Sequence, residues 1–350
     1  MTITQEQVLT ALSQVQDPEL HRDLVTLNMI QDIQIHDSDV NFKINLTTPS
    51  CPLRSRMETD SRAAVMAIPG VKSVKVEFGA TVPNDSRIGN KLDLKVKNAI
   101  AVGSGKGGVG KSTVAVNLAI SLAQSGAKVG LLDADIYGPN IPTMMGIDHL
   151  PPPNNQRIIP AEAYGVKVMS IGFLVKPGQA MIWRGPMLHS AIKQFLSDVE
   201  WGPLDYLIID LPPGTGDAQI SLAQTIPLSG GIIVTLPQQV SVDDASRAVE
   251  MYRALDVPVL GIIENMSYLV LPDGKLMEIF GRGGGEKLSR ETQVPFLGKI
   301  PILSEVREGG DKGEPVVAVL PETSAAKALV AISQLVAAQV SMATIQNEAA

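Results

Sequence analysis

The chain has 350 residues of ordinary globular composition, 45% apolar and 19% charged. Its formal net charge of −7 disfavours a broad surface for nucleic acid or for anionic membranes. It contains one cysteine, Cys51, no secretory signal at its start and no apolar run of the roughly 18 residues that a membrane helix needs, so we expect a cytoplasmic protein without nucleic-acid or membrane partners.

The first 80 residues predict a small α+β domain. Apolar residues recur at helical spacing over 4–16, which predicts a helix. Apolar and polar residues alternate over 40–47 and again over 70–78, as in half-buried strands, and a second helix is predicted over 52–67. A unit of this size is within the range of independently folding domains.

Residues 81–96 have little apolar periodicity, which predicts a linker. From 97 to 340, short continuous apolar segments alternate with helical stretches. This rhythm predicts an α/β domain with a largely parallel sheet covered by helices on both faces. Residues 341–350 are expected to form a disordered tail. The predicted strands are 99–103, 127–133, 205–210, 231–236, 257–263 and 296–299, and the clearest helices are 112–125 and 243–255.

A glycine-rich segment, Gly105-Lys-Gly-Gly-Val-Gly-Lys-Ser-Thr113, joins the first of these strands to the first helix. It satisfies the pattern G-x-x-x-x-G-K-[ST] in the strand–helix context that the pattern requires. Glycines there let backbone N–H groups converge on phosphate oxygens, and the helix N-terminus adds partial positive charge. The pattern predicts an ATP site rather than an empty glycine-rich turn. The loop residues expected at the nucleotide are Gly105, Gly107, Gly108, Val109 and Gly110.

Three side chains at the start of the helix have separate expected roles at that site. Lys111 would reach the β- and γ-phosphates, and the Ser112 hydroxyl would bind Mg²⁺. Thr113 supplies a second hydroxyl near the α-phosphate.

Two acidic strand ends support this interpretation. Asp133 ends the strand 127–133 and Asp135 directly follows it, and Asp210 ends the strand 205–210, so all three are expected at the carboxyl edge of the sheet, where α/β proteins bind ligands. Asp210 is the Walker B candidate, which holds Mg²⁺ directly or through water. The turn that follows contains Gly214, whose backbone N–H is a candidate sensor of the γ-phosphate.

The segment from Lys106 to Thr113 resembles the deviant Walker A loop of the MinD/ParA class of ATPases. The resemblance implies a homodimer that sandwiches ATP, with Lys106 reaching the partner's nucleotide, whereas composition alone would make Lys106 a solvated loop lysine. It also implies that Asp135 positions or activates the attacking water, so Lys106, Lys111 and Asp135 are the catalytic candidates.

Two further residues are candidates for contact with the base. Asn265 resembles the residue that reads the adenine edge in this class, and Asp311 lies in a loop expected near the base. Both are also common turn residues, which is an equally good interpretation.

Four longer motifs, Leu132–Asn140, Trp183–Pro186, Asp210–Asp217 and Glu264–Ser267, together resemble the Mrp/ApbC family of iron–sulfur cluster carrier ATPases, and the match runs over about residues 97 to 335. The N-terminal unit resembles the iron–sulfur assembly-type domain that is commonly fused to bacterial members, through Asp17-Pro-Glu19 and Leu46-Thr-Thr-Pro-Ser-Cys51-Pro. The resemblance implies ATP, Mg²⁺ and an iron–sulfur cluster as cofactors, and iron–sulfur apoproteins and assembly factors as partners. The motifs in the larger domain begin at Leu132, Trp183, Asp210 and Glu264.

The chain departs from this family at the cluster ligands. A Cys-x-x-Cys is expected shortly after Asn265, but Leu271 and Gly274 stand about where its thiolates belong. A four-iron cluster is ordinarily held by four thiolates, and a homodimer would offer only two copies of Cys51. Any cluster should therefore be labile, completed by external thiols, partner cysteines, or oxygen or imidazole donors.

Cys51 is the remaining candidate iron–sulfur ligand in the chain. It precedes a predicted helix, whose N-terminus would favour the thiolate. The alternative is a small buried apolar residue, which is the common situation of cysteines outside disulfides.

The sequence as a whole predicts an ATP-hydrolysing carrier or assembly factor that delivers iron–sulfur clusters to apoproteins. One alternative is a positioning ATPase of the MinD/ParA kind, although the apolar segment 325–339 lacks the basic face of a membrane-binding helix. The other is an assembly scaffold that docks apoproteins without carrying a cluster.

Overall fold

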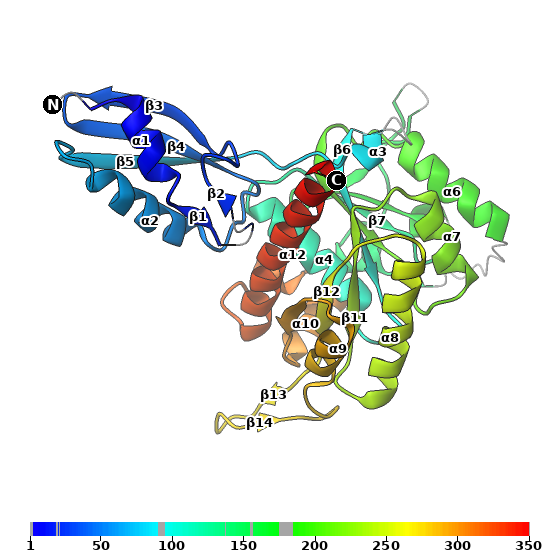
Figure 1. Cartoon of the computed structure of the whole chain (residues 1–350). Coiled ribbons are helices and arrows are strands. Elements are labelled where there is room, and N and C mark those ends of the chain that lie inside the picture. The colour runs from blue at the N-terminus through cyan, green and yellow to red at the C-terminus, as the bar shows by residue number, and fades with distance from the viewer. Residues whose placement is uncertain are drawn as a thin grey trace. The chain divides into compact units, whose positions relative to one another are not determined.

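A computed structural model of the chain describes residues 3–18, 20, 22–89, 95–136, 138–154, 157–174 and 185–349 (Figure 1). It divides into two compact units, Met1–Pro83 and Asn84–Ala350. Each unit has its own core of buried apolar side chains.

The first unit packs two helices against a three-stranded sheet in the order β3-β4-β5. β3 and β4 are antiparallel, and α2 connects β4 to β5, which run parallel. Alternate residues of β4, from Val40 to Leu46, face the core. The predicted small α+β domain is confirmed. Its elements are α1 (Gln5–Leu12), β1 (Gln16–Asp17), β2 (Arg22–Asp23), β3 (Ile30–His36), β4 (Asp39–Leu46), α2 (Arg54–Met66) and β5 (Ser73–Ala80).

The sequence did not predict β3. Its register shifts between Gln31 and Gln34, where Asp32 has a left-handed backbone with φ of 52°. The bulge breaks the alternation of apolar and polar residues by which a strand is recognised in sequence.

In the described residues, the second unit is built on an eight-stranded sheet in the order β15-β12-β11-β6-β10-β7-β9-β8. All neighbouring strands are parallel except the edge pair β8 and β9. The strands are β6 (Val96–Gly103), β7 (Val129–Asp133), β8 (Ala161–Ala163), β9 (Val166–Ser170), β10 (Leu204–Asp210), β11 (Gly230–Thr235), β12 (Val259–Glu264) and β15 (Phe296–Lys299), with a separate hairpin of β13 (Leu269–Val270) and β14 (Leu276–Met277).

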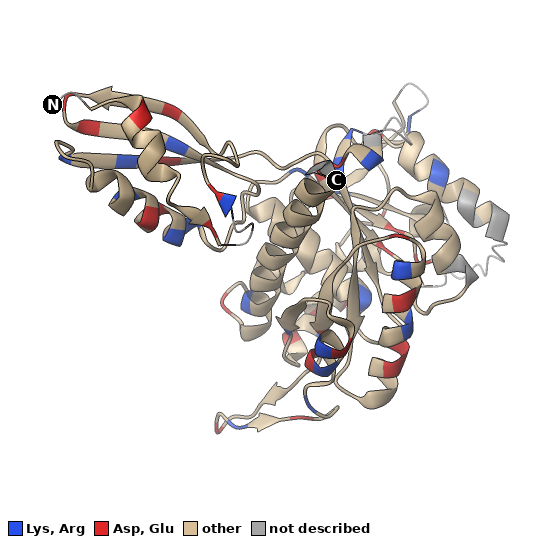
Figure 2. Ribbon diagram, in the orientation of Figure 1, with Lys and Arg blue, Asp and Glu red and all other residues tan. Residues whose placement is uncertain are grey.

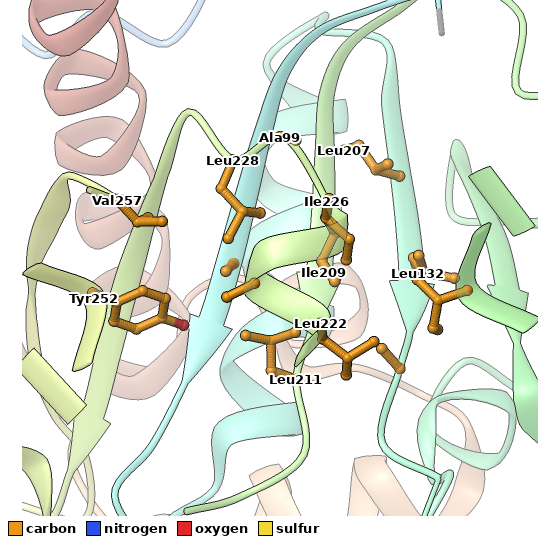
Figure 3. Close-up of a cluster of buried hydrophobic side chains, with 14 of the residues drawn as sticks. Ala99, Leu132, Leu207, Ile209, Leu211, Leu222, Ile226, Leu228, Tyr252 and Val257 are labelled. Carbon is orange, nitrogen blue, oxygen red and sulfur yellow. The ribbon is translucent and has the colours of Figure 1, made fainter. Parts of the chain in front are cut away.

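Helices cover both faces of this sheet (Figure 1). α6, α7, α8 and α9 share one apolar core with it, and Figure 3 shows Leu222 of α7 and Ile226, which directly follows this helix, near Ile209 of β10. α4, α11 and α12 pack together on the other face. The predicted parallel sheet with helices on both faces is confirmed. The helices are α3 (Ser86–Gly89), α4 (Lys111–Gln124), α5 (Ile141–Met144), η1 (Ile171–Leu174), α6 (Gly185–Ser197), α7 (Asp217–Thr225), α8 (Gln239–Ala254), α9 (Gly284–Thr292), α10 (Ser304–Lys312), α11 (Val316–Val319) and α12 (Ser324–Ala349).

The predicted linker 81–96 was wrong over part of its length. Asp85, 2% exposed, accepts hydrogen bonds from the backbone and the guanidinium of Arg87, and Ile88 is fully buried in the core of the second unit. Residues 84–89 therefore belong to the second unit. The segment was misread because one turn of helix has too few residues to show apolar periodicity.

The predicted disordered tail at 341–350 was also wrong, because α12 continues to Ala349. Ser341 and Thr344 are at most 2% exposed, and the Thr344 hydroxyl donates to Oδ1 of Asn98 in β6, 3.1 Å away. The buried Thr344 hydroxyl thus attaches the end of the helix to the sheet, beyond the segment whose apolar pattern was visible in the sequence.

One described helix is long and apolar enough to cross a membrane, which is weak evidence by itself. Its span, Ser324–Asn347, has a mean hydropathy of 1.7 and is half buried inside the protein. The helix packs against α4, β12 and β15. This packing is that of a helix covering one face of the sheet.

Candidate functional site

Charged residues lie mainly on the helices and loops, and the inner strands of the large sheet are largely uncharged (Figure 2). The exceptions at the carboxyl edge are the last residues of three strands, Asp133 of β7, Asp210 of β10 and Glu264 of β12. Each of these carboxylates is at most 1% exposed. Burying a carboxylate is costly unless a cation or hydrogen-bond donors compensate it, so this edge is a candidate site.

The loop between β6 and α4 lies at the same edge, and its glycines are required by backbone geometry. Gly108 and Gly110 have φ of 80° and 82°, in the left-handed region. A Cβ on Gly105 would lie 2.1 Å from the backbone carbon of Asp244 in α8. A Cβ on Gly110 would lie 2.2 Å from the Asn265 amide nitrogen. The loop therefore holds this shape only with glycine at these positions.

Lys111 and Ser112, at the start of α4, both contact Asp210. The Lys111 ammonium lies 2.7 Å from Oδ1 of Asp210 and 3.5 Å from Oδ2 of Asp135. The Ser112 hydroxyl donates to the other oxygen of Asp210 over 2.6 Å. Four of the predicted residues are thus brought within contact of one another, although Asp210 is about 100 positions further along the chain.

Burial dominates the electrostatics of this cluster. Burial, together with the negative charge of Asp210, raises the pKa of Asp133 to about 8. Burial also raises the pKa of Asp210 above its ordinary value, although Lys111 and Ser112 oppose the rise. The Lys111 ammonium pairs with two carboxylates here, Asp210 and Asp135. The raised pKa values of Asp133 and Asp210 mean that negative charge is poorly compensated in this cluster, which favours binding of a further cation.

Asp133 fixes the segment that carries Asp135. Its Oδ1 accepts the backbone N–H of Asp135 over 3.1 Å. Its Oδ2 accepts the backbone N–H of Ile141 and the hydroxyl of Ser170, over 3.3 and 2.8 Å. The sequence predicted Asp133 at the edge of the sheet, but only Asp135 was expected to have a role there, that of positioning or activating the attacking water.

Two adjoining pockets open at this edge. The smaller, about 220 Å³, is lined by the glycine-rich loop, Lys111, Ser112 and Asp135, and Lys106 also lines it. The larger, about 490 Å³, is lined mainly by apolar residues and by Asn265 and Asp311. The two share Thr113, Asn140 and Met144 as lining residues, so they form one continuous cleft. A polar pocket for phosphates next to an apolar pocket for a planar group is the arrangement that a nucleotide needs.

Asn265 and Asp311, the two candidates for contact with the base, both line the larger pocket. Different contacts hold their side chains there. The Asn265 side-chain amide donates to the Val109 carbonyl over 2.8 Å, which ties it to the glycine-rich loop. Asp311 is exposed and pairs with Arg307 of α10. The sequence predicted no role for Asn140, Met144, Met266 and the segment 301–303, which also line the pocket. Asn140 and Met266 lie within the motifs that begin at Leu132 and Glu264, whereas Met144 and the segment 301–303 lie outside them.

Gly214 lies next to the loop, with φ of 97°. Its backbone N–H donates to the Ser104 carbonyl over 2.9 Å. The group predicted to sense a γ-phosphate is therefore already engaged.

The candidate cluster ligand Cys51 belongs to the first unit. It is half-buried, packs against that unit's core and lies three positions before the start of α2 at Arg54. Glu19 and Trp183, from two of the quoted motifs, lie outside the described residues. Over the described ranges, no group of three or more His, Cys, Asp or Glu side chains is arranged to hold a metal.

Leu271 and Gly274, where the thiolates were expected, lie at the tip of the β13–β14 hairpin. The Gly274 N–H donates to the Leu271 carbonyl over 2.8 Å, and Gly274 has φ of 81°. The tip is a tight turn that favours glycine at this position.

The sequence model of the family described as NUBPL iron-transfer P-loop NTPase matches residues 95–337. The chain belongs to this family. A second model, described as iron–sulfur cluster assembly protein, matches residues 5–78, so each structural unit has its own match.

Relatives match nearly the whole chain. The iron–sulfur cluster carrier protein of Synechocystis sp. is 52% identical over 351 residues, covering 98% of this chain and 99% of that protein. The protein of the same name from Escherichia coli is 40% identical over 336 residues, covering 95% and 91%.

Solved structures resemble the larger unit. A nucleotide-binding protein from Archaeoglobus fulgidus in complex with ADP has a TM-score of 0.57 and 40% identity, covering 66% of this chain and 92% of that one. The cell division ATPase MinD of Pyrococcus furiosus has a TM-score of 0.54 at 24% identity, covering 68% and 97%, which supports the fold alone.

Proposed function

We propose that this protein is a cytoplasmic, ATP-hydrolysing iron–sulfur cluster carrier or assembly factor that serves iron–sulfur apoproteins. The observation that carries the proposal is the presence in one chain of a nucleotide-sized cleft with buried acidic and lysine groups and of an iron–sulfur assembly-type unit. The iron–sulfur cluster carrier proteins of Synechocystis sp. and Escherichia coli match both units of this chain, which supports assigning the two units to one activity.

In this proposal the glycine-rich loop and Lys111 bind the phosphates. Nucleotide phosphates would draw the Lys111 ammonium from Asp210, which it now contacts at 2.7 Å. The hydroxyl of Ser112 and the carboxylate of Asp210 are oxygen donors of the kind that Mg²⁺ prefers, and the 2.6 Å hydrogen bond between them holds the two groups side by side. Bound there, Mg²⁺ would neutralise charge on the β- and γ-phosphates.

Asp135 is positioned to orient the attacking water. It is 8% exposed, lines the phosphate pocket and is fixed through its backbone by Asp133. Lys106 lines the same pocket from the loop, and we assign it to the partner's nucleotide in an ATP-closed homodimer. Gly214 would sense the γ-phosphate only by exchanging its bond to Ser104, which makes that bond a candidate trigger of the ATP-dependent change.

The cluster is the cargo in this scheme. A homodimer contributes at most two thiolates, both from Cys51, so the other ligands would come from small thiols or from cysteines of the client. Such a cluster should be bound loosely and transferred readily.

Anaerobic reconstitution with iron and sulfide, followed by iron and sulfide analysis and visible absorbance, tests this function. We expect iron uptake by the wild type in the presence of a small thiol, and its loss in Cys51→Ser. Thr48→Ser, a nearby change that leaves the thiol in place, should retain uptake. Equal uptake by Cys51→Ser and the wild type would contradict the assignment of Cys51.

A second candidate, an assembly scaffold that docks apoproteins without a cluster, is favoured by the turn at Leu271 to Gly274, which lacks thiols. The wild type would then take up no iron but would bind an apoprotein in an ATP-dependent manner. A positioning ATPase would do neither, and would instead co-sediment with lipid or DNA when ATP is added.

A further inference from the structure

Glu264, the last residue of β12, is a carboxylate that the proposed ATPase chemistry does not use. It is 1% exposed. Lys299, opposite it on β15, pairs instead with Glu286 over 3.0 Å. Glu264 is therefore held by hydrogen bonds, and its neighbours decide what it does.

Its two oxygens bind two different segments. Oε1 accepts the Ser267 hydroxyl over 2.7 Å. Oε2 accepts the backbone N–H of Gly285 over 2.7 Å, in the first turn of α9, where the helix dipole also favours negative charge. A Cβ on Gly285 would lie 3.3 Å from that oxygen, so glycine permits this close approach.

The bond to Ser267 closes a tight turn over residues 264–267. The Ser267 hydroxyl also lies 3.0 Å from the Glu264 carbonyl, and Met266 between them has a left-handed backbone with φ of 52°. This conformation is unfavourable for a residue with a side chain, so it persists only where the surroundings impose it. Glu264 supplies part of that constraint.

The turn carries two residues of the larger pocket, Asn265 and Met266. The backbone N–H of Asn265 donates to the Thr235 carbonyl over 2.8 Å, and its side-chain amide donates to the Val109 carbonyl. The carbonyl oxygen of that side chain can then accept a hydrogen bond from a base amino group. Because Asn265 directly follows Glu264, a change in the carboxylate's bonds would move Asn265 in the pocket.

We propose that Glu264 is a positioning residue for the nucleotide base, acting through Asn265 and Met266. The inference rests on the proposed ATP site. Through these two residues, Glu264 would contribute to the affinity for ATP and to the preference for ATP over GTP, because guanine presents an oxygen acceptor where adenine presents an amino donor.

Steady-state hydrolysis of ATP and GTP by the full chain tests the proposal. Glu264→Ala removes both bonds and should raise KM for ATP about tenfold while kcat changes less than about threefold, the pattern of lost ground-state binding. The ATP-over-GTP preference in kcat/KM should fall by a similar factor. In Glu264→Gln, the amide oxygen can accept the Gly285 N–H and the amide NH₂ can donate to Ser267, so KM should stay within about threefold of the wild type.

Glu286→Gln is the matched control, because it alters a carboxylate on α9 that contacts Lys299 and not the turn. It should leave both KM values unchanged. If Glu264→Ala does not fold, Ser267→Ala, which removes the hydroxyl but leaves the bond between Oε2 and Gly285, should raise KM for ATP about threefold.

An unchanged KM for ATP in Glu264→Ala, or in Ser267→Ala if that variant replaces it, would overturn the inference, and so would a fall in kcat alone. Binding of a fluorescent ATP analogue to the wild type separates this result from failure of the proposed function. A wild type that does not bind the analogue overturns the ATP site itself. If the wild type binds the analogue and the variant has an unchanged KM for ATP, only the role of Glu264 is overturned.

Discussion

Single residues decide the charge balance of the cleft. The Lys111 ammonium lies 2.7 Å from a carboxylate oxygen of Asp210 and 3.5 Å from one of Asp135, so it contacts both of these buried carboxylates. The same group is expected to bind phosphate, so nucleotide binding exchanges one set of anions for another. We expect Asp135 to stay buried at the pocket wall through this exchange, because its backbone N–H is bound to Asp133.

Substitutions of Lys111 and Asp135 should therefore have different kinetic effects. Lys111→Ala should lower hydrolysis at least ~1000-fold, because phosphate charge is no longer compensated. Asp135→Ala should lower kcat about 100-fold while the Kd for ATP stays within about threefold, because the carboxylate acts on water rather than on the nucleotide. Phosphate release and equilibrium binding measure the two effects. Asp148→Ala, an exposed carboxylate beyond α5, is the control, and full turnover in Asp135→Ala would refute the mechanism.

At the scale of elements, the segment 84–89 shows how a polar cluster can anchor a short helix. Burial by itself would raise the pKa of Asp85, but hydrogen bonds from the side chain and backbone of Arg87 outweigh it and hold that pKa below its usual value. Arg87 also donates to the Ser229 carbonyl, at the start of β11. The pair thereby attaches α3 to the sheet.

This attachment should make stability depend on pH. A carboxyl whose pKa is lowered by folding stabilises the protein above its unfolded pKa, near 4, and this stabilisation is lost as pH falls through the lower folded value. Asp85→Asn should reduce the free energy of unfolding by about 1–2 kcal/mol at pH 7, and the difference from the wild type should shrink below pH ~4. Urea denaturation at several pH values measures it. Glu322→Gln, in an exposed ion pair, should have almost no effect, and an equally small effect of Asp85→Asn would disprove the attachment.

At the scale of the whole molecule, the cleft and the cysteine lie in different units. The cleft is lined entirely by residues of Asn84–Ala350, and Cys51 belongs to Met1–Pro83. We therefore expect the proposed ATP hydrolysis to require the second unit, and the proposed iron chemistry to require the first.

Two fragments test this division and its boundary. Residues 84–350 should hydrolyse ATP within about twofold of the full chain's rate. Residues 97–350 lose buried Ile88 and the Asp85–Arg87 pair, so their free energy of unfolding should be about 3 kcal/mol lower. Thermal denaturation and phosphate release compare them. Equal melting temperatures would place the boundary after residue 96.

The sequence alone was sufficient for the position of the glycine-rich loop, the parallel sheet and the family. The loop is one contiguous segment whose glycines state its backbone geometry directly, and buried parallel strands are recognisable as continuous apolar runs. The prediction from sequence failed where the local pattern is weak or interrupted, at β3, at the one-turn helix α3 and at the end of α12.

Only the tertiary structure decided the rest of the cleft. Its larger pocket is lined by segments near residues 140, 265 and 305, and no sequence pattern in one of these segments indicates that it lies next to the other two. The order of the strands brings these segments together, because parallel strands deliver their carboxyl ends to one edge whatever their separation in the chain. The contacts of Asp133 and Glu264 depend on that same edge. Their residue type could be read from the sequence, but the partners that give each carboxylate its role could not.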